Sequence, residues 1–105
     1  MHKWRNHGFL YAGDGLWRLS PAYDIVPFPQ STDTWTLALQ IGREGRLATV
    51  DNALSAAPLF GLRPADATLI VEKIRENVRQ WRDLFSENGV RETDMQRISG
   101  CFRDL

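Results

Sequence analysis

The sequence predicts a mainly helical α+β fold, on three observations. Residues 8–19 have the pattern of a β-hairpin, and residues 35–41 alternate like a short strand. Apolar residues then recur at helical spacing through much of residues 50–104. The chain has 105 residues, 43% of them hydrophobic and 25% charged, which is enough for one small globular core. We therefore expect a hairpin and a short strand packed on about three helices.

The hairpin prediction depends on the turn between two apolar strands. Residues 9–11 form the first strand and residues 16–19 the second. Between them, Ala12-Gly13-Asp14-Gly15 supplies the Gly and Asp residues that tight hairpin turns need, because these residues tolerate a left-handed backbone. Residues 20–34 follow as a proline-rich loop, since proline lacks the N–H that a regular strand or helix uses.

The first predicted helix covers residues 50–60. Thr49 can accept a hydrogen bond at its start, and Asp51 in the first turn suits the positive end of the helix dipole. Pro58 lies late in this stretch and has no backbone N–H, so the helix either bends there or stops just before it. Gly61 follows as a suitable terminator.

Two further helices are predicted over residues 64–86 and 93–104. Pro64 has the fixed φ that suits a first helical position, and Thr93 with Gln96 matches a capping box. The helices have an apolar stripe, and the longer one has a charged opposite face, which is typical of a solvated surface over a core. The residues expected in the core are Leu54, Phe60, Ile70, Ile74, Trp81, Met95, Ile98 and Phe102.

Charge and composition argue against several classes of protein. The formal net charge is zero, so direct binding to nucleic acid or to an anionic membrane is not expected. No segment has the roughly 18 consecutive apolar residues of a transmembrane helix, and no signal peptide is recognisable, so we expect a cytoplasmic location. The one cysteine, Cys101, lies among apolar helix positions, where we expect a packed thiol and no disulfide.

Most patterns that carry chemistry do not occur in the sequence. His2 and His7 lack the third ligand that a zinc site needs, and there is no Gly-x-Ser-x-Gly motif of a hydrolase. The glycines of the hairpin turn are too few for a phosphate-binding loop. Asn6 and Asp24 remain, one on each side of the hairpin. Kinases bind Mg²⁺ through an Asn and an Asp from successive loops, because hard cations prefer oxygen ligands. On residue type alone this pair is a weak signal.

Three stretches resemble a known family. The sequence "RNHGFLY" with "WRLSPAYDIVP", and the later "ATVDNALSAAPLFGLRPADA", are similar to the C-terminal lobe of the HipA-like serine/threonine kinases, the toxin component of bacterial HipBA-type toxin–antitoxin pairs. The resemblance covers nearly the whole chain and implies a partial kinase-like C-lobe. Residues 1–34 would hold truncated catalytic and metal-binding loops with the hairpin, and residues 35–105 a strand and a helical bundle.

The resemblance also implies roles for particular residues. Asn6 matches the catalytic-loop Asn and Asp24 the metal-binding Asp, which implies Mg²⁺ and ATP in the full family. The family's catalytic base is an Asp five residues before that Asn, and this position is Met1 here. Lys3 stands where the family has a His. The nucleotide-binding lobe and its lysine have no counterpart in the sequence. No catalytic residue is therefore assigned, and the chain alone is expected to be inactive.

Two classes of function stay open at this point. In the first, the chain is a fragment of a HipA-like protein kinase that needs an N-terminal half in trans. In the second, it is a non-catalytic module that binds a kinase half or an antitoxin-like protein. A gene remnant without function is a third alternative. If the chain is a kinase fragment, we expect Trp4 or Trp35 in an exposed docking surface. For the fold as a whole, we expect self-association or exposed apolar surface on the hairpin side.

Overall fold

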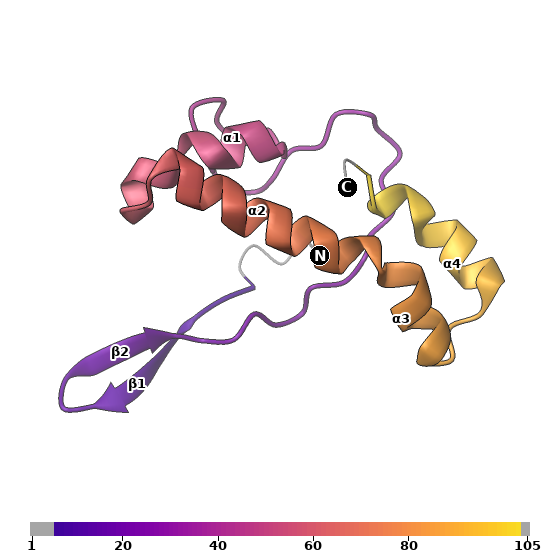
Figure 1. Ribbon diagram of the computed structural model, residues 1–105, viewed down its shortest axis with the longest axis horizontal. Helices are drawn as coiled ribbons and strands as arrows, with labels where there is room; N and C mark the ends of the chain where they lie inside the picture. Colours follow the sequence, from indigo (N-terminus) through magenta and orange to yellow (C-terminus); the bar gives the residue numbers. More distant parts are fainter. Residues whose placement is uncertain (1–5, 104–105) are drawn as a thin grey trace.

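A two-stranded hairpin forms one end of the molecule. The computed structural model describes residues 6–103, in which β1 (Phe9–Gly13) pairs antiparallel with β2 (Leu16–Leu19), as Figure 1 shows. Asp14 and Gly15 form the turn with φ angles of 51° and 75°, both left-handed as a type I′ turn requires. The predicted hairpin is confirmed. Its first strand is longer than expected because Gly13 still pairs with β2 across a bulge.

Residues 35–48 form a loop with isolated pairings, so the predicted strand over residues 35–41 is wrong. The isolated β-bridges in this loop join Thr36 to Leu47 and Gly42 to Gly45. Asn52 explains the irregularity. Its side chain donates to the carbonyl oxygens of Gly45 (3.0 Å) and Leu47 (2.8 Å) and accepts from the N–H of Glu44 (2.8 Å). A side chain thus satisfies backbone groups that a regular strand pair would have satisfied.

The predicted helix over residues 50–60 is present as two shorter pieces, α1 (Val50–Ser55) and the 3₁₀ helix η1 (Ala57–Phe60). The Thr49 hydroxyl accepts a hydrogen bond from a first-turn N–H, which confirms the predicted cap. Pro58 cannot donate to the carbonyl four residues before it, and the α-helix accordingly stops ahead of it. Gly61 ends η1 with a left-handed φ of 69°.

The predicted helix over residues 64–86 is divided at Gln80 into α2 (Pro64–Arg79) and α3 (Trp81–Glu87). Pro64 is the first residue of α2, as predicted. No Pro or Gly lies at this break between α2 and α3. The Gln80 N–H bonds to the carbonyl of Asn77, three residues back, so the helix tightens and turns at that residue.

The last predicted helix consists of α4 (Glu92–Ile98) and the 3₁₀ helix η2 (Ser99–Cys101). It begins before Thr93, so the predicted capping box is wrong. Arg91 occupies the capping position and makes no side-chain cap bond. Its guanidinium instead pairs with Asp94, at 3.0 Å.

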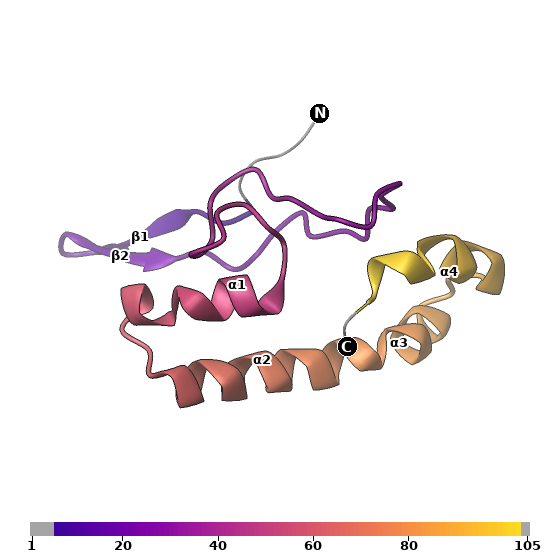
Figure 2. The same ribbon diagram turned by 90° about the horizontal axis from the view of Figure 1, so that it is seen from above.

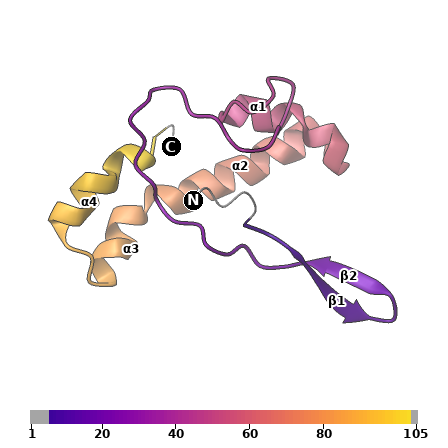
Figure 3. The same cartoon turned by 180° about the vertical axis from the view of Figure 1, so that it is seen from behind.

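The helices form two groups along α2. Figure 2 shows α1 lying along the first half of α2. Figure 3 shows α3 and α4 at the end opposite to the hairpin. There the Trp81 ring stacks on Phe102 (centroids 4.1 Å apart), and Phe85 contacts both rings edge-on. This aromatic cluster fixes the turn between α2 and α3.

The core is smaller than the sequence predicts. Of the eight residues expected there, only Trp81 and Met95 are buried, while Leu54, Ile98 and Phe102 are half-buried. Phe60, Ile70 and Ile74 are exposed, so their predicted burial is wrong. Helical periodicity identifies an apolar face, but the described segments cover only part of it and leave these three side chains 47–77% exposed.

The molecule is open for its length. Its radius of gyration is 16.1 Å, whereas a compact domain of this size has about 13 Å. Within residues 6–103, no helix comes close to the hairpin, which projects away from the helical part (Figure 1). The mainly helical α+β class is confirmed, but the hairpin does not pack on the helices. None of the helices described in this part of the chain is long and apolar enough to cross a bilayer.

Candidate functional site

Hydrogen bonds join the two chain segments at the base of the hairpin. Beyond the paired strands, the N–H of Ser20 donates to the carbonyl of Gly8 (2.7 Å), and the N–H of Tyr23 donates to the carbonyl of Asn6 (3.2 Å). The Ser20 hydroxyl accepts from the N–H of Gly8 at 2.9 Å, and the Tyr23 hydroxyl donates to the carbonyl of His7 at 3.1 Å. These bonds hold residues 6–8 against residues 20–24.

Asn6 and Asp24 meet at this base, although 18 positions separate them. The side-chain amide of Asn6 donates to the backbone carbonyl of Asp24 over 3.3 Å. The backbone of Asp24 is left-handed, with a φ of 57°, a conformation that Asp tolerates better than most residues. The structure therefore brings together the two residues that the sequence predicts as metal ligands.

The side-chain oxygen of Asn6 has the properties expected of a ligand atom. Asn6 Oδ1 is enclosed and has no hydrogen-bond partner among residues 6–103. An enclosed amide oxygen without a partner is costly unless a donor or a cation satisfies it. The carboxylate of the neighbouring Asp24 is exposed and can supply a negatively charged oxygen. This donor set fits Mg²⁺, which binds through one or two protein oxygens and completes its shell with water or phosphate.

Several predictions concern residues outside the described part of the chain. Met1, at the position of the family's catalytic base, is one of them, and so are His2, Lys3 and Trp4. Within the described residues, no group of three or more His, Cys, Asp or Glu side chains could hold a metal ion. The candidate site therefore consists of the Asn6 and Asp24 pair.

The comparisons with known proteins decide the family. The model of the HipA-like C-terminal domain matches residues 1–82, which is most of the chain. The chain belongs to the HipA-like C-terminal domain family. No curated protein and no solved structure matches it. The matched region includes the hairpin, α1 and α2, and it ends at the start of α3.

Sequence reasoning did not identify two residues that shape the site of this HipA-like domain. The hydroxyls of Ser20 and Tyr23 join the two segments that carry Asn6 and Asp24. Both lie in the stretch "LSPAYD" that supports the family resemblance, but nothing in their spacing indicates that they bond to backbone groups across the hairpin. That role depends on the register Phe9–Leu19, which brings Gly8 opposite Ser20.

Two other residues singled out in the sequence lie away from this site. Trp35 was expected in a docking surface near the hairpin, but its ring is half-buried against the guanidinium of Arg103. Cys101 is half-buried in η2, and burial raises the pKa of its thiol. A raised pKa lowers the fraction of reactive thiolate, which agrees with the expected packed thiol.

Proposed function

We propose that this HipA-like domain supplies the metal-binding side of a phosphoryl-transfer site. The observation that carries the proposal is the juxtaposition of Asn6 and Asp24 at the base of the hairpin, in a chain whose family is established. In the HipA-like serine/threonine kinases that the sequence resembles, residues at these two positions bind Mg²⁺. The hydroxyl bonds of Ser20 and Tyr23 support the proposal because they position both ligand-bearing segments.

Each residue of the pair has a distinct task in this proposal. Asn6 offers its enclosed Oδ1 as a neutral ligand, while its amide bond to the Asp24 carbonyl fixes the orientation of the side chain. Asp24 offers the negative charge. A Mg²⁺ ion held by these two residues would neutralise charge on the phosphates of ATP. The two side chains would hold the ion in place and would perform no proton transfer themselves.

We further propose that these 105 residues do not transfer phosphate by themselves. Phosphoryl transfer depends on a base or a positioned nucleophile, on cations around the phosphates and on in-line geometry. The position that the family fills with the catalytic Asp is Met1 in this sequence. Activity would then require a polypeptide that supplies the base and the nucleotide-binding lobe.

A Mg²⁺ titration followed by NMR tests the metal site, and a labelled-ATP assay tests the activity. We expect millimolar Mg²⁺ to shift the side-chain amide of Asn6 and the backbone amide of Asp24 in a saturable way. The chain alone should transfer no label to a protein substrate. Transfer by the purified chain, or unchanged spectra with Mg²⁺, would overturn the corresponding part of the proposal.

A second function, a non-catalytic interaction module, is favoured by the exposed hairpin. The pairing places Phe9, Tyr11, Trp17 and Leu19 on one face of the sheet, and each of these side chains is more than half exposed. An apolar sheet face of this kind is typical of a protein-binding surface. The two functions are separable, because Asn6→Ala and Asp24→Ala would leave a pure interaction module intact. A kinase half or an antitoxin-like protein is the partner that we propose.

A further inference from the structure

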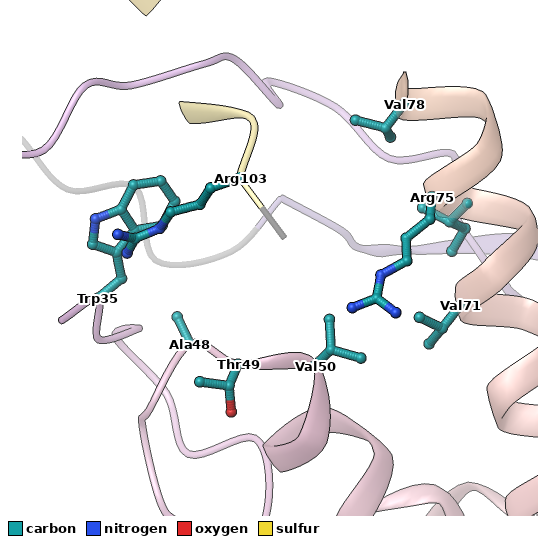
Figure 4. A pocket seen from close by; sticks show the side chains of 9 residues that line it. Trp35, Ala48, Thr49, Val50, Val71, Arg75, Val78 and Arg103 are labelled. Atoms are coloured by element: carbon teal, nitrogen blue, oxygen red, sulfur yellow. The ribbon is translucent and has the colours of Figure 1, made fainter. Parts of the chain in front are cut away.

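A pocket lies on the helical part of the molecule, away from Asn6 and Asp24. It has a volume of about 310 Å³, which is within the range of small-molecule sites. Figure 4 shows Val50 of α1 and Val71 and Val78 of α2 along its walls, and Trp35 and Arg103 on the side facing α2. Most of the lining is apolar, and the polar groups are few.

Arg103 brings a cation to one side of this pocket. Its guanidinium stacks on the Trp35 ring, 3.6 Å from the centroid. The ring is itself held, because its indole N–H donates to the carbonyl of Thr32 over 3.0 Å. Among residues 6–103, no carboxylate forms an ion pair with Arg103. A stacked guanidinium keeps its N–H edge available for an acceptor.

Arg75 brings a second cation from the opposite side. Its guanidinium points from α2 into the pocket (Figure 4). One nitrogen, Nη1, donates to Glu72 at 2.9 Å. The Nε–H is enclosed and has no acceptor among the described residues. A buried donor without an acceptor is the kind of group that a bound ligand satisfies.

We propose that this pocket binds an organic monoanion, a carboxylate attached to an apolar ring or chain. Among the described residues at this pocket, Arg75 and Arg103 contribute two positive charges, and Glu72, which pairs with Arg75, contributes one negative charge, so one positive charge is left for the ligand to neutralise. The valine walls suit an apolar body, and a dianion would lose more hydration on entering them. The carboxylate accepts from the enclosed Arg75 Nε, and Arg103 adds a second positive charge on the opposite side of the pocket. This site is independent of the metal pair and of the proposed phosphoryl transfer.

NMR titration of the ¹⁵N-labelled chain with benzoate tests the proposal. We expect saturable shifts at the indole N–H of Trp35 and the Nε–H of Arg75. Benzyl alcohol, which has the same ring without the charge, should bind about tenfold more weakly, since a charge-assisted hydrogen bond is lost. Equal affinity for the two compounds, tighter binding of phenyl phosphate, or no saturable shift with any carboxylate would overturn the proposal.

Two capped peptides distinguish a free acid from the terminus of another chain. Acetyl-Gly-Phe with a free carboxylate is compared with its amide. Binding of the acid form at least as tightly as benzoate identifies a chain terminus as the source of the carboxylate, and preference for benzoate identifies a small acid. Either outcome supports the proposed chemistry. Equal binding of the peptide acid and its amide counts against it.

Variants then assign the binding to the two arginines. Arg75→Gln should weaken benzoate binding about tenfold because it removes a charged donor, and Arg103→Gln should weaken it less because it removes only a positive charge across the pocket. Arg82→Gln is the matched control: Arg82 also lies over a tryptophan, Trp81, at 4.6 Å, but outside this pocket. Unchanged affinity in both pocket variants would overturn the assignment. The benzoate and benzyl alcohol comparison in the unmodified chain keeps the test decisive if a variant does not fold.

Discussion

Asn6 donates its side-chain amide to the backbone carbonyl of Asp24 over 3.3 Å, while its own side-chain oxygen is enclosed without a partner in the described part of the chain. The bond fixes which way the amide faces, because only the NH₂ group can donate. The oxygen is thereby directed away from the Asp24 carbonyl. The arrangement orients one neutral oxygen beside a residue that carries a negatively charged one.

Asp24→Asn should weaken Mg²⁺ binding without disturbing the hairpin. Asn tolerates a left-handed backbone as well as Asp does, but it carries no charge, so the loss of a charged ligand should lower the affinity at least about tenfold. The Mg²⁺ titration by NMR measures this change. Asp14→Asn is the control, since Asp14 is also left-handed (φ 51°) and lies at the far end of the hairpin. Equal losses in both variants would show that the metal does not bind at Asp24.

We propose that the chain self-associates through the exposed hairpin, and Trp17→Lys should then abolish its concentration-dependent association. Trp17 shares one face of the hairpin with Phe9, Tyr11 and Leu19, and it contacts Tyr11 edge-on with centroids 5.3 Å apart. A charge in the centre of this apolar face disfavours its burial against a second copy. Sedimentation velocity over a range of concentrations measures the association.

Leu10→Lys is the matched control for that experiment. Leu10 lies in β1, on the opposite face of the hairpin from Trp17, and pairs with Arg18, so the same substitution should leave association unchanged. A strictly monomeric unmodified chain would refute the proposed association. An identical effect of both substitutions would place the contact elsewhere.

Asn52→Ala should destabilise the fold by about 3 kcal/mol, since three hydrogen bonds are lost and each contributes about 1 kcal/mol. Among residues 6–103, Asn52 is the most buried polar residue, at 1% exposure, and its side chain holds the loop that runs over α1. Urea unfolding measures the free energy of unfolding. Asn88→Ala removes one exposed hydrogen bond at the end of α3 and should lower the free energy of unfolding by only about 0.5 kcal/mol or less. Similar losses in the two variants would contradict this role of Asn52.

Local chemistry explains which elements could be predicted from the sequence. Asp14 and Gly15 define the hairpin turn by themselves, and Pro64 marks the start of α2, because a backbone preference acts within a few residues. The role of Asn52 and the break at Gln80 depend on contacts between distant segments. No residue near Gln80 signals a turn, and it is the stacking of Trp81 on Phe102 that holds it.

The candidate site likewise has features that the sequence predicts and features that depend on contacts between distant segments. Asn6 and Asp24 could be nominated because a family pattern fixes their spacing around the hairpin. The hydrogen bonds of the Ser20 and Tyr23 hydroxyls could not be predicted from the sequence, because they follow from the register of the strands. The pocket beside Arg75 could not be predicted either. It requires the C-terminal segment to return to the Trp35 loop, which no sequence periodicity encodes.

Trp81→Ala and Phe60→Ala should differ sharply in stability, although periodicity placed both residues in the core. Trp81 is 8% exposed and stacks on Phe102, so its truncation should cost about 3–5 kcal/mol as a cavity opens between α3 and η2. Phe60 is 77% exposed, and its truncation should change the free energy of unfolding by about 0.5 kcal/mol or less. Urea unfolding monitored by circular dichroism measures both values. Comparable losses would mean that a second surface covers Phe60 in solution. Unfolding at several protein concentrations would then test whether this surface belongs to another copy of the chain. Only association makes the unfolding midpoint depend on protein concentration.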